Sequence, residues 1–218
     1  MVRHVPFQNR EQAASLLADR LAFYRGQRPL VLAIPRGAAP MAEIIAKALQ
    51  GDLDVVLVHK LGAPGQPELA VGAVDEFGAI SLGRHAHELG VDQAYLEREA
   101  QLQLATLRTR RSRYTPVHPP IDPAGRVVII VDDGVATGAT MIAALKAVRA
   151  KHPTKLVAAT AVAPPETFEE LRGLADDVVC LEVPEMFFAV GQFFRDFPQV
   201  SDEDVVAILK RSRSAFKT

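Results

Sequence analysis

Short, uninterrupted apolar runs alternate along this chain with stretches of helical periodicity. Continuous hydrophobicity, as opposed to an alternating pattern, is typical of strands that are buried on both faces. Strands that are separated by helices pair in parallel through right-handed crossovers. The pattern therefore predicts an α/β fold in which helices cover both faces of a mostly parallel central sheet. The runs expected to form strands are 30–34, 53–58, 127–131, 156–162 and 178–183.

Several helices begin with clear start signals. Asn9 and Gln12 form a capping pattern at the start of the first helix, and Asp92 is placed to cap a long one. Ser201 and the three acids that follow it open the last helix, where negative charge is favourable. The first helix is predicted to bury an apolar face made of Ala13, Leu16, Leu17 and Leu21.

The composition excludes several classes of protein. The 218 residues suit one domain and can bury a full core. No apolar run approaches the roughly 18 to 20 residues that span a bilayer, and the N-terminal residues lack the apolar stretch of a secretory signal. The single cysteine, Cys180, cannot form an internal disulfide, so a reduced, cytoplasmic setting is expected. A net charge of −1 argues against a broad electrostatic surface for nucleic acid.

The most informative segment reads VVIIVDDGVATGAT and covers residues 127–140. Asp132 and Asp133 follow a strand directly, and ligands of open parallel sheets bind beyond the carboxyl ends of the strands. A carboxylate repels phosphate but accepts hydrogen bonds well from hydroxyl groups. Two acids at this place therefore predict a site for a vicinal diol. The alternative is that both acids only cap a turn, although one cap needs only one acid.

The residues after the two acids suit a phosphate. The start of the following helix offers unpaired N–H groups and a partial positive charge. Gly134 and Gly138 allow the backbone to approach a ligand closely. Thr137 and Thr140 add hydroxyl donors. Acids for a diol beside a loop for a phosphate together predict a sugar-phosphate site; neither a Walker A loop nor a GxGxxG fingerprint is present.

VIIVDDGVATGAT (128–140) resembles the phosphoribosyl pyrophosphate (PRPP) signature of type I phosphoribosyltransferases: apolar residues, two acids, small residues, then Thr-Gly-x-Thr. Ala136 stands where hypoxanthine–guanine-type enzymes carry a catalytic aspartate, so the chain is more similar to the adenine and orotate types. The segments 34–40, 59–74 and 183–197 resemble a subgroup of proteins with this domain. The resemblance implies a single domain over 1–218, with a core at about 28–183, a flexible hairpin loop at about 61–83 and a small hood at 184–200.

The same resemblance implies the residues that bind PRPP. Arg36 and Gly37 look like the diphosphate loop, in which one peptide bond is often cis, and Lys60 could reach the same diphosphate as a point charge. His59 stands where family members commonly carry another basic residue. Mg²⁺ would arrive on the diphosphate and need no dedicated protein ligands, and a homodimer is implied. The predicted PRPP site is completed by Asp132, Asp133, Gly134, Val135, Ala136, Thr137, Gly138, Ala139 and Thr140.

Catalytic roles follow from this assignment. Asp132, Asp133 and Lys60 would act electrostatically as charge develops during the transfer. Glu68 is the only acid between Lys60 and residue 74, which makes it the candidate proton acceptor, with a solvated loop acid as the alternative. In the hood, Phe187 and Phe188 could stack on an acceptor ring, or pack into the core instead.

The expected function is Mg²⁺-dependent transfer of a phosphoribosyl group from PRPP to an acceptor nitrogen, with release of pyrophosphate. The acceptor is not identified by the sequence. One alternative is a PRPP-responsive regulator that binds RNA, for which RTRRSR (108–113) is the only basic candidate. Arginines at a helix end more often offset the negative end of the helix dipole, so neither nucleic acid nor a membrane is an expected partner. A second alternative is a hydrolase or mutase that binds a ribose monophosphate and ignores pyrophosphate.

Overall fold

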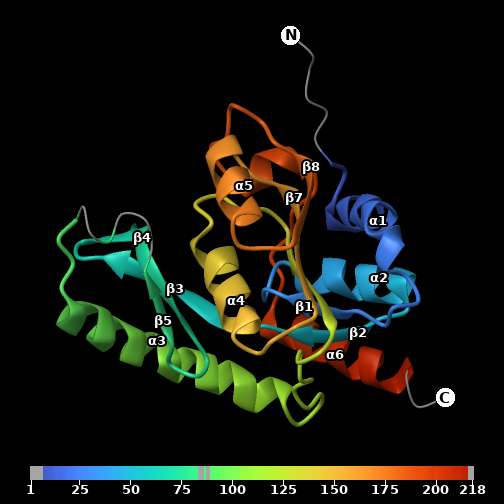
Figure 1. The fold of residues 1–218 in the computed structure, drawn as a ribbon, viewed down its shortest axis with the longest axis horizontal. Helices are drawn as coiled ribbons and strands as arrows, with labels where there is room; N and C mark the ends of the chain where they lie inside the picture. Colours follow the sequence, from blue (N-terminus) through green and yellow to red (C-terminus); the bar gives the residue numbers. More distant parts are fainter. Residues whose placement is uncertain (1–6, 83–85, 87–88, 216–218) are drawn as a thin grey trace.

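The computed structural model describes residues 7–82, 86 and 89–215, without the side chains of 67, 68 and 213–215. Its central sheet has five parallel strands in the order β2-β1-β6-β7-β8 (Figure 1). This confirms the predicted parallel α/β architecture. The strands are β1 (Leu30–Ala33), β2 (Asp52–Val55), β6 (Val127–Asp132), β7 (Lys155–Val162) and β8 (Asp177–Glu182).

Helices cover both faces of this sheet (Figure 1). In β6, Ile129 and Val131 belong to the same core cluster as residues of α1 and α2, whereas Val128 and Ile130 pack in a second cluster with residues of α4. Successive side chains of a strand point to opposite faces, so both sets must be apolar. The helices are α1 (Arg10–Arg20), α2 (Ala39–Leu49), α4 (Ala139–Arg149), α5 (Pro165–Arg172) and α6 (Asp202–Ala215), with short 3₁₀ turns η1 (Ala22–Tyr24) and η2 (Val190–Phe193).

The predicted helix starts are confirmed. The Asn9 side chain accepts a hydrogen bond from the backbone N–H of Gln12 at 2.9 Å. Asp92 accepts in the same way at the start of α3 (Gln93–Tyr114), and Ser201 does so ahead of α6. The apolar face of α1 needs one correction, because Leu16 is 43% exposed. Its neighbour Leu17 is fully buried and contributes to the core instead.

The predicted strand 53–58 is wrong as a single element. The chain leaves the central sheet after Val55, and β3 (Val58–Ala63) begins a second sheet. That sheet is antiparallel and contains β3, β4 (Gln66–Asp75) and β5 (Ile80–Leu82), so most of the segment expected as a hairpin loop at 61–83 is regular structure. The long helix α3 runs along this sheet (Figure 1). The Tyr95 hydroxyl of α3 donates a hydrogen bond to the carbonyl of Gly62 in β3 at 2.9 Å.

The order of the central strands determines where a ligand can bind. Strand β1 lies between β2 and β6. After β1 the next strand of the sheet, β2, is added on one side, whereas after β6 the strands β7 and β8 are added on the other side. Such a switch point leaves a crevice at the carboxyl ends of the two middle strands. Ala33 is paired with Val131, which brings the loops after β1 and β6 next to each other.

None of the helices within the described ranges is long and apolar enough to cross a membrane.

Candidate functional site

The loop after β6 is held from two neighbouring elements. The backbone N–H of Val135 donates to the carbonyl of Val162 in β7, and the Thr167 hydroxyl of α5 donates to the carbonyl of Ala136, both at 2.8 Å. Gly138 precedes α4 with a positive φ of 80°, a conformation that favours glycine. Among the residues that the structure describes, none accepts a hydrogen bond from the backbone amides of 136–141. These amides therefore form the kind of helix-start group that binds phosphate.

The acid pair lies at the base of this loop. Asp133 is buried, and its backbone N–H donates to Oδ1 of Asp132 at 2.9 Å. Burial and the neighbouring Asp133 charge raise the pKa of Asp132 well above its usual range. Burial also raises the pKa of Asp133, but the guanidinium of Arg10 opposes this rise. Of the two, Asp133 is thus the better stabilised as a carboxylate.

Arg10 is the residue that sequence reasoning missed. It is the first residue of α1, and its Nε and Nη2 both lie 2.8 Å from Oδ2 of Asp133. The contact joins residues 123 positions apart, so no local pattern in the sequence signals it. A lone arginine after a helix cap is ordinary in sequence, and only the fold reveals that its side chain is buried.

The predicted diphosphate loop meets the acid pair directly. The peptide bond between Pro35 and Arg36 is cis, in the loop that follows β1. Gly37 lies so close to Asp133 that a Cβ at Gly37 would collide with Oδ2 of the carboxylate. Arg36 and Gly37 also line a shallow pocket of about 350 Å³ together with Arg10 and residues 197–200. The structure therefore brings the two predicted loops into contact, although they lie about a hundred residues apart in sequence.

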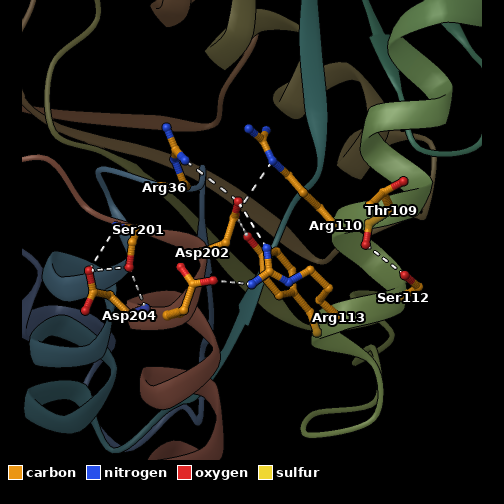
Figure 2. A network of polar contacts seen from close by, with 10 residues as sticks. Arg36, Thr109, Arg110, Ser112, Arg113, Ser201, Asp202 and Asp204 are labelled. Atoms are coloured by element: carbon orange, nitrogen blue, oxygen red, sulfur yellow. Dashed lines mark hydrogen bonds and ion pairs between the residues drawn. The ribbon is translucent and has the colours of Figure 1, made fainter.

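Figure 2 shows what surrounds the Arg36 side chain. Its Nη1 lies 3.7 Å from Asp202, the first residue of α6, and Arg110 and Arg113 of α3 approach the same carboxylate at 3.7 Å. The Tyr114 hydroxyl donates to Asp202 at 2.5 Å. Arginines of the RTRRSR run thus have acidic partners within the chain. This favours a role in holding the fold together over a role in binding RNA.

The small sheet faces the phosphate loop across a pocket of about 230 Å³. Ala136 and Thr137 line this pocket from the loop, and Gly72 and Ser81 line it from β4 and β5. Lys60 lies in β3, opposite Ala73, so it belongs to the small sheet and not to the central one. Glu68 lies in β4, but its side chain is outside the described residues.

The hood also contacts the phosphate loop. A Cβ at Gly134 would collide with a methyl group of Val190 in η2, so the hood leaves no room for a side chain there. Phe187 is half-buried and its ring lies 5.4 Å from that of Phe193. Phe188 is 83% exposed. Of the two predicted acceptor residues, Phe187 packs against the core and Phe188 faces the solvent.

Comparisons with known proteins show the family to which the chain belongs. The chain is 44% identical over 214 residues to two Mycobacterium tuberculosis proteins, from strains CDC 1551 / Oshkosh and ATCC 25618 / H37Rv, that are provisionally named phosphoribosyl transferases. The match covers 96% of this chain but 48% of theirs, so the chain spans about half the length of these curated relatives.

Solved structures show the same fold. The crystal structure of TT1426 from Thermus thermophilus is 49% identical, with a TM-score of 0.83 over 94% of this chain and 98% of the other. The AQ2163 protein from Aquifex aeolicus is 14% identical, with a TM-score of 0.51 over 84% of this chain and 76% of the other. The sequence model of the phosphoribosyl transferase domain matches residues 7–198, nearly the whole chain. The chain therefore belongs to the phosphoribosyl transferase domain family.

Proposed function

We propose that the chain binds PRPP with Mg²⁺ and transfers its phosphoribosyl group to a nitrogenous base, with release of pyrophosphate. The observation that carries this proposal is the contact between two loops at the switch point of the sheet. One loop offers paired acids and unpaired helix-start amides, and the other offers Arg36 and Gly37. A pentose with a phosphate at one end and a diphosphate at the other matches this arrangement.

Each group would have one task. Thr137, Gly138 and Thr140 would hold the 5-phosphate, because their amides and hydroxyls converge at the start of α4. Asp132 and Asp133 would accept hydrogen bonds from the two ribose hydroxyls. Arg36 and Gly37, joined by Lys60, would steady the diphosphate.

The reaction would be a substitution at the anomeric carbon of the sugar. The bond from that carbon to the diphosphate oxygen breaks, and its electron pair leaves with pyrophosphate. The lone pair of the acceptor nitrogen forms the new bond, and the proton on that nitrogen goes to Glu68 in β4. Positive charge develops on the sugar meanwhile, and the nearby carboxylates stabilise it.

Mg²⁺ would supply charge neutralisation on the diphosphate. Within the described ranges, no group of three or more histidine, cysteine or acidic side chains could hold a metal ion. A cation that is carried mainly by substrate oxygens and water would need no such group from the protein.

Thermal melting with PRPP and Mg²⁺ tests the proposal. Ligand at 100 times its dissociation constant adds about 2.7 kcal/mol of stability, which is roughly 5 to 10 °C for a chain of this size. We expect a shift of this order in the parent protein, and its loss in the double variant Asp132→Asn, Asp133→Asn. An unchanged melting temperature in the parent would remove PRPP from the proposal. If the shift is present, pyrophosphate release with a panel of nucleobases then identifies the acceptor and separates an enzyme from a sensor.

A further inference from the structure

Arg10 uses its whole guanidinium group in contacts with the site. It is only 8% exposed, and both Nε and Nη2 approach the same carboxylate oxygen of Asp133. Its third nitrogen, Nη1, donates to the carbonyl of Pro198 at 2.7 Å, and the central carbon of the group lies 3.7 Å from the ring centre of Phe197. A single side chain of α1 thus connects the acid pair with the end of the hood.

The hood is also fastened to the chain just before Arg10. Phe7 pairs with Phe194 in a short parallel bridge, in which the N–H of Phe7 donates to the Phe193 carbonyl at 2.6 Å. The N–H groups of Arg195 and Asp196 donate back to the carbonyls of residues 7 and 8 at 2.8 and 2.9 Å. Residues 7–10 and 193–198 therefore form one hydrogen-bonded unit that ends at the Arg10 guanidinium.

The geometry at Asp133 leaves part of the carboxylate available. Both Arg10 nitrogens contact Oδ2, and no side chain within the described residues donates to Oδ1, although the backbone N–H groups of Asp133 and Gly134 also stabilise this carboxylate. The adjacent carboxylates of Asp132 and Asp133 repel each other, and without a cation they would tend to share a proton. The buried cation favours the charged form of Asp133 and fixes the direction of its carboxylate, which a hydroxyl-binding acid requires.

We propose that Arg10 is a positioning residue of the ribose site, which holds Asp133 against the diphosphate loop and couples that carboxylate to segment 193–198. The inference rests on the proposed function, because it assigns Asp133 to the sugar hydroxyls. A consequence is that a ligand bound at the sugar site also affects the hood. Ribose binding at Asp133 rigidifies the hood before any acceptor arrives.

Two probes separate the ribose site from the diphosphate site: ribose 5-phosphate alone, and pyrophosphate with Mg²⁺. In Arg10→Gln, we expect the affinity for ribose 5-phosphate to fall about tenfold to a hundredfold, because a hydrogen-bonded charge partner of Asp133 is lost. The affinity for pyrophosphate falls by a clearly smaller factor, because Arg36 and Gly37 remain in the pocket that Arg10 also lines. Arg10→Lys keeps the charge but cannot serve Asp133 and Pro198 together, so it recovers part of the loss. Arg20→Gln, an exposed change in the same helix, is the matched control and leaves both affinities unchanged.

A double-mutant cycle decides whether Arg10 acts through the acid. In an Asp133→Asn background, Arg10→Gln is expected to have no further effect on ribose 5-phosphate affinity. Hydrogen exchange gives a readout that a purely structural role would not move. Amides of 193–198 become more protected when ribose 5-phosphate binds to the parent, and this gain disappears in Arg10→Gln.

Each outcome is decisive. If the parent binds neither probe, the proposed function fails, and the role of Arg10 fails with it. If the parent binds both probes and Arg10→Gln binds ribose 5-phosphate equally well, only the role of Arg10 is wrong. Additive effects in the double-mutant cycle also contradict the role of Arg10.

If Arg10→Gln does not fold, the variants Arg10→Lys and Phe197→Leu replace it. In Phe197→Leu the Arg10 guanidinium loses the aromatic ring that it stacks on. A fall in ribose 5-phosphate affinity of about two- to threefold, with pyrophosphate affinity unaffected, supports the proposal. If neither variant loses ribose 5-phosphate affinity, the proposal is overturned.

Discussion

The two neighbouring carboxylates at the end of β6 cost stability in the absence of a ligand. Asp132 has a raised pKa because its carboxylate is partly removed from solvent and lies beside a second acid. Each unit by which the folded state raises the pKa corresponds to about 1.4 kcal/mol of destabilisation once the group is charged. Groups that bind a ligand often destabilise the protein that carries them.

The raised pKa of Asp132 gives a prediction with a definite sign. Between the unfolded pKa of about 4 and the higher folded value, the native state binds more protons, so its stability falls as the pH rises. Asp132→Asn removes this loss. At about pH 7.5 we expect the melting temperature of the variant to exceed that of the parent by about 2 to 4 °C for each kcal/mol of destabilisation that the substitution removes. At about pH 4 we expect the two proteins to melt at the same temperature. Scanning calorimetry across this pH range, with the exposed Asp19→Asn as control, measures it. A variant that is less stable than the parent at the higher pH would contradict the assigned cause.

Gly37 allows a second prediction at the scale of single residues. A methyl group there collides with Oδ2 of Asp133, so Gly37→Ala must displace either the loop or the acid. We expect the stabilisation by PRPP and Mg²⁺ to be lost, and unfolding to be easier by about 1 to 3 kcal/mol. Gly173→Ala is the matched control, since its Cβ would meet only one carbonyl oxygen, at 3.4 Å. A full ligand shift in Gly37→Ala would show that Asp133 need not stay where it lies.

Some of these residues could be predicted from the sequence, and others could not. Asp132, Asp133 and the following loop form one contiguous segment, so their types and order carry the information. Arg10 contributes through a contact with a residue 123 positions away. Its burial depends on the docking of α1 and the hood, which no local pattern encodes.

At the scale of elements, the border between β2 and β3 shows why an apolar run can mislead. Val56, Leu57 and Val58 are all buried, so hydrophobicity continues without a break. The partners change within this run: the N–H of Val56 donates to the carbonyl of Ala33 in the central sheet, whereas the carbonyl of Leu57 accepts from the N–H of Glu76, just after β4 of the small sheet. The hydrophobic pattern indicates that these residues are buried, but it does not indicate which of the two sheets they belong to. The sequence therefore predicted a single strand.

Helix α3 allows a test of the RNA-binding alternative. Arg111 forms a bidentate pair with Glu76 at 2.6 Å, and Arg113 contacts Glu203 at 2.5 Å. Because these charges are matched within the chain, the helix offers little counterion release to a nucleic acid. We expect a labelled RNA oligonucleotide to bind no more tightly than about 10⁻⁴ M at physiological salt, as measured by fluorescence anisotropy. Micromolar binding with a steep salt dependence would reverse this conclusion.

At the scale of the whole molecule, the single cysteine reports on opening of the fold. Cys180 lies in the edge strand β8 with its thiol 3.1 Å from the carbonyl of Glu182, and burial raises its pKa to about 11. At about pH 8 its thiolate is therefore about 100-fold rarer than that of an ordinary cysteine. We expect slow labelling by a chromogenic disulfide reagent, acceleration by urea, and slower labelling again with PRPP and Mg²⁺. Labelling at the rate of a free thiol in the native protein would contradict this.

The architecture as a whole followed from the sequence because continuous apolar strands and intervening helices leave few arrangements. The strand order did not follow, since nothing in β1 specifies which two strands flank it. Pairing of β1 with both β2 and β6 depends on how α2 and the small sheet pack around them.

The adjacency of β1 and β6 has a consequence for synthesis of the protein. A nascent chain that ends between the Arg36 loop and β6 contains that loop but not its acidic counterpart. Domains form as units while translation proceeds at about 5 to 20 residues per second. The ligand therefore cannot assist the segment before β6 as it emerges from the ribosome, and it can stabilise the fold only after β6 and its loop have docked beside β1.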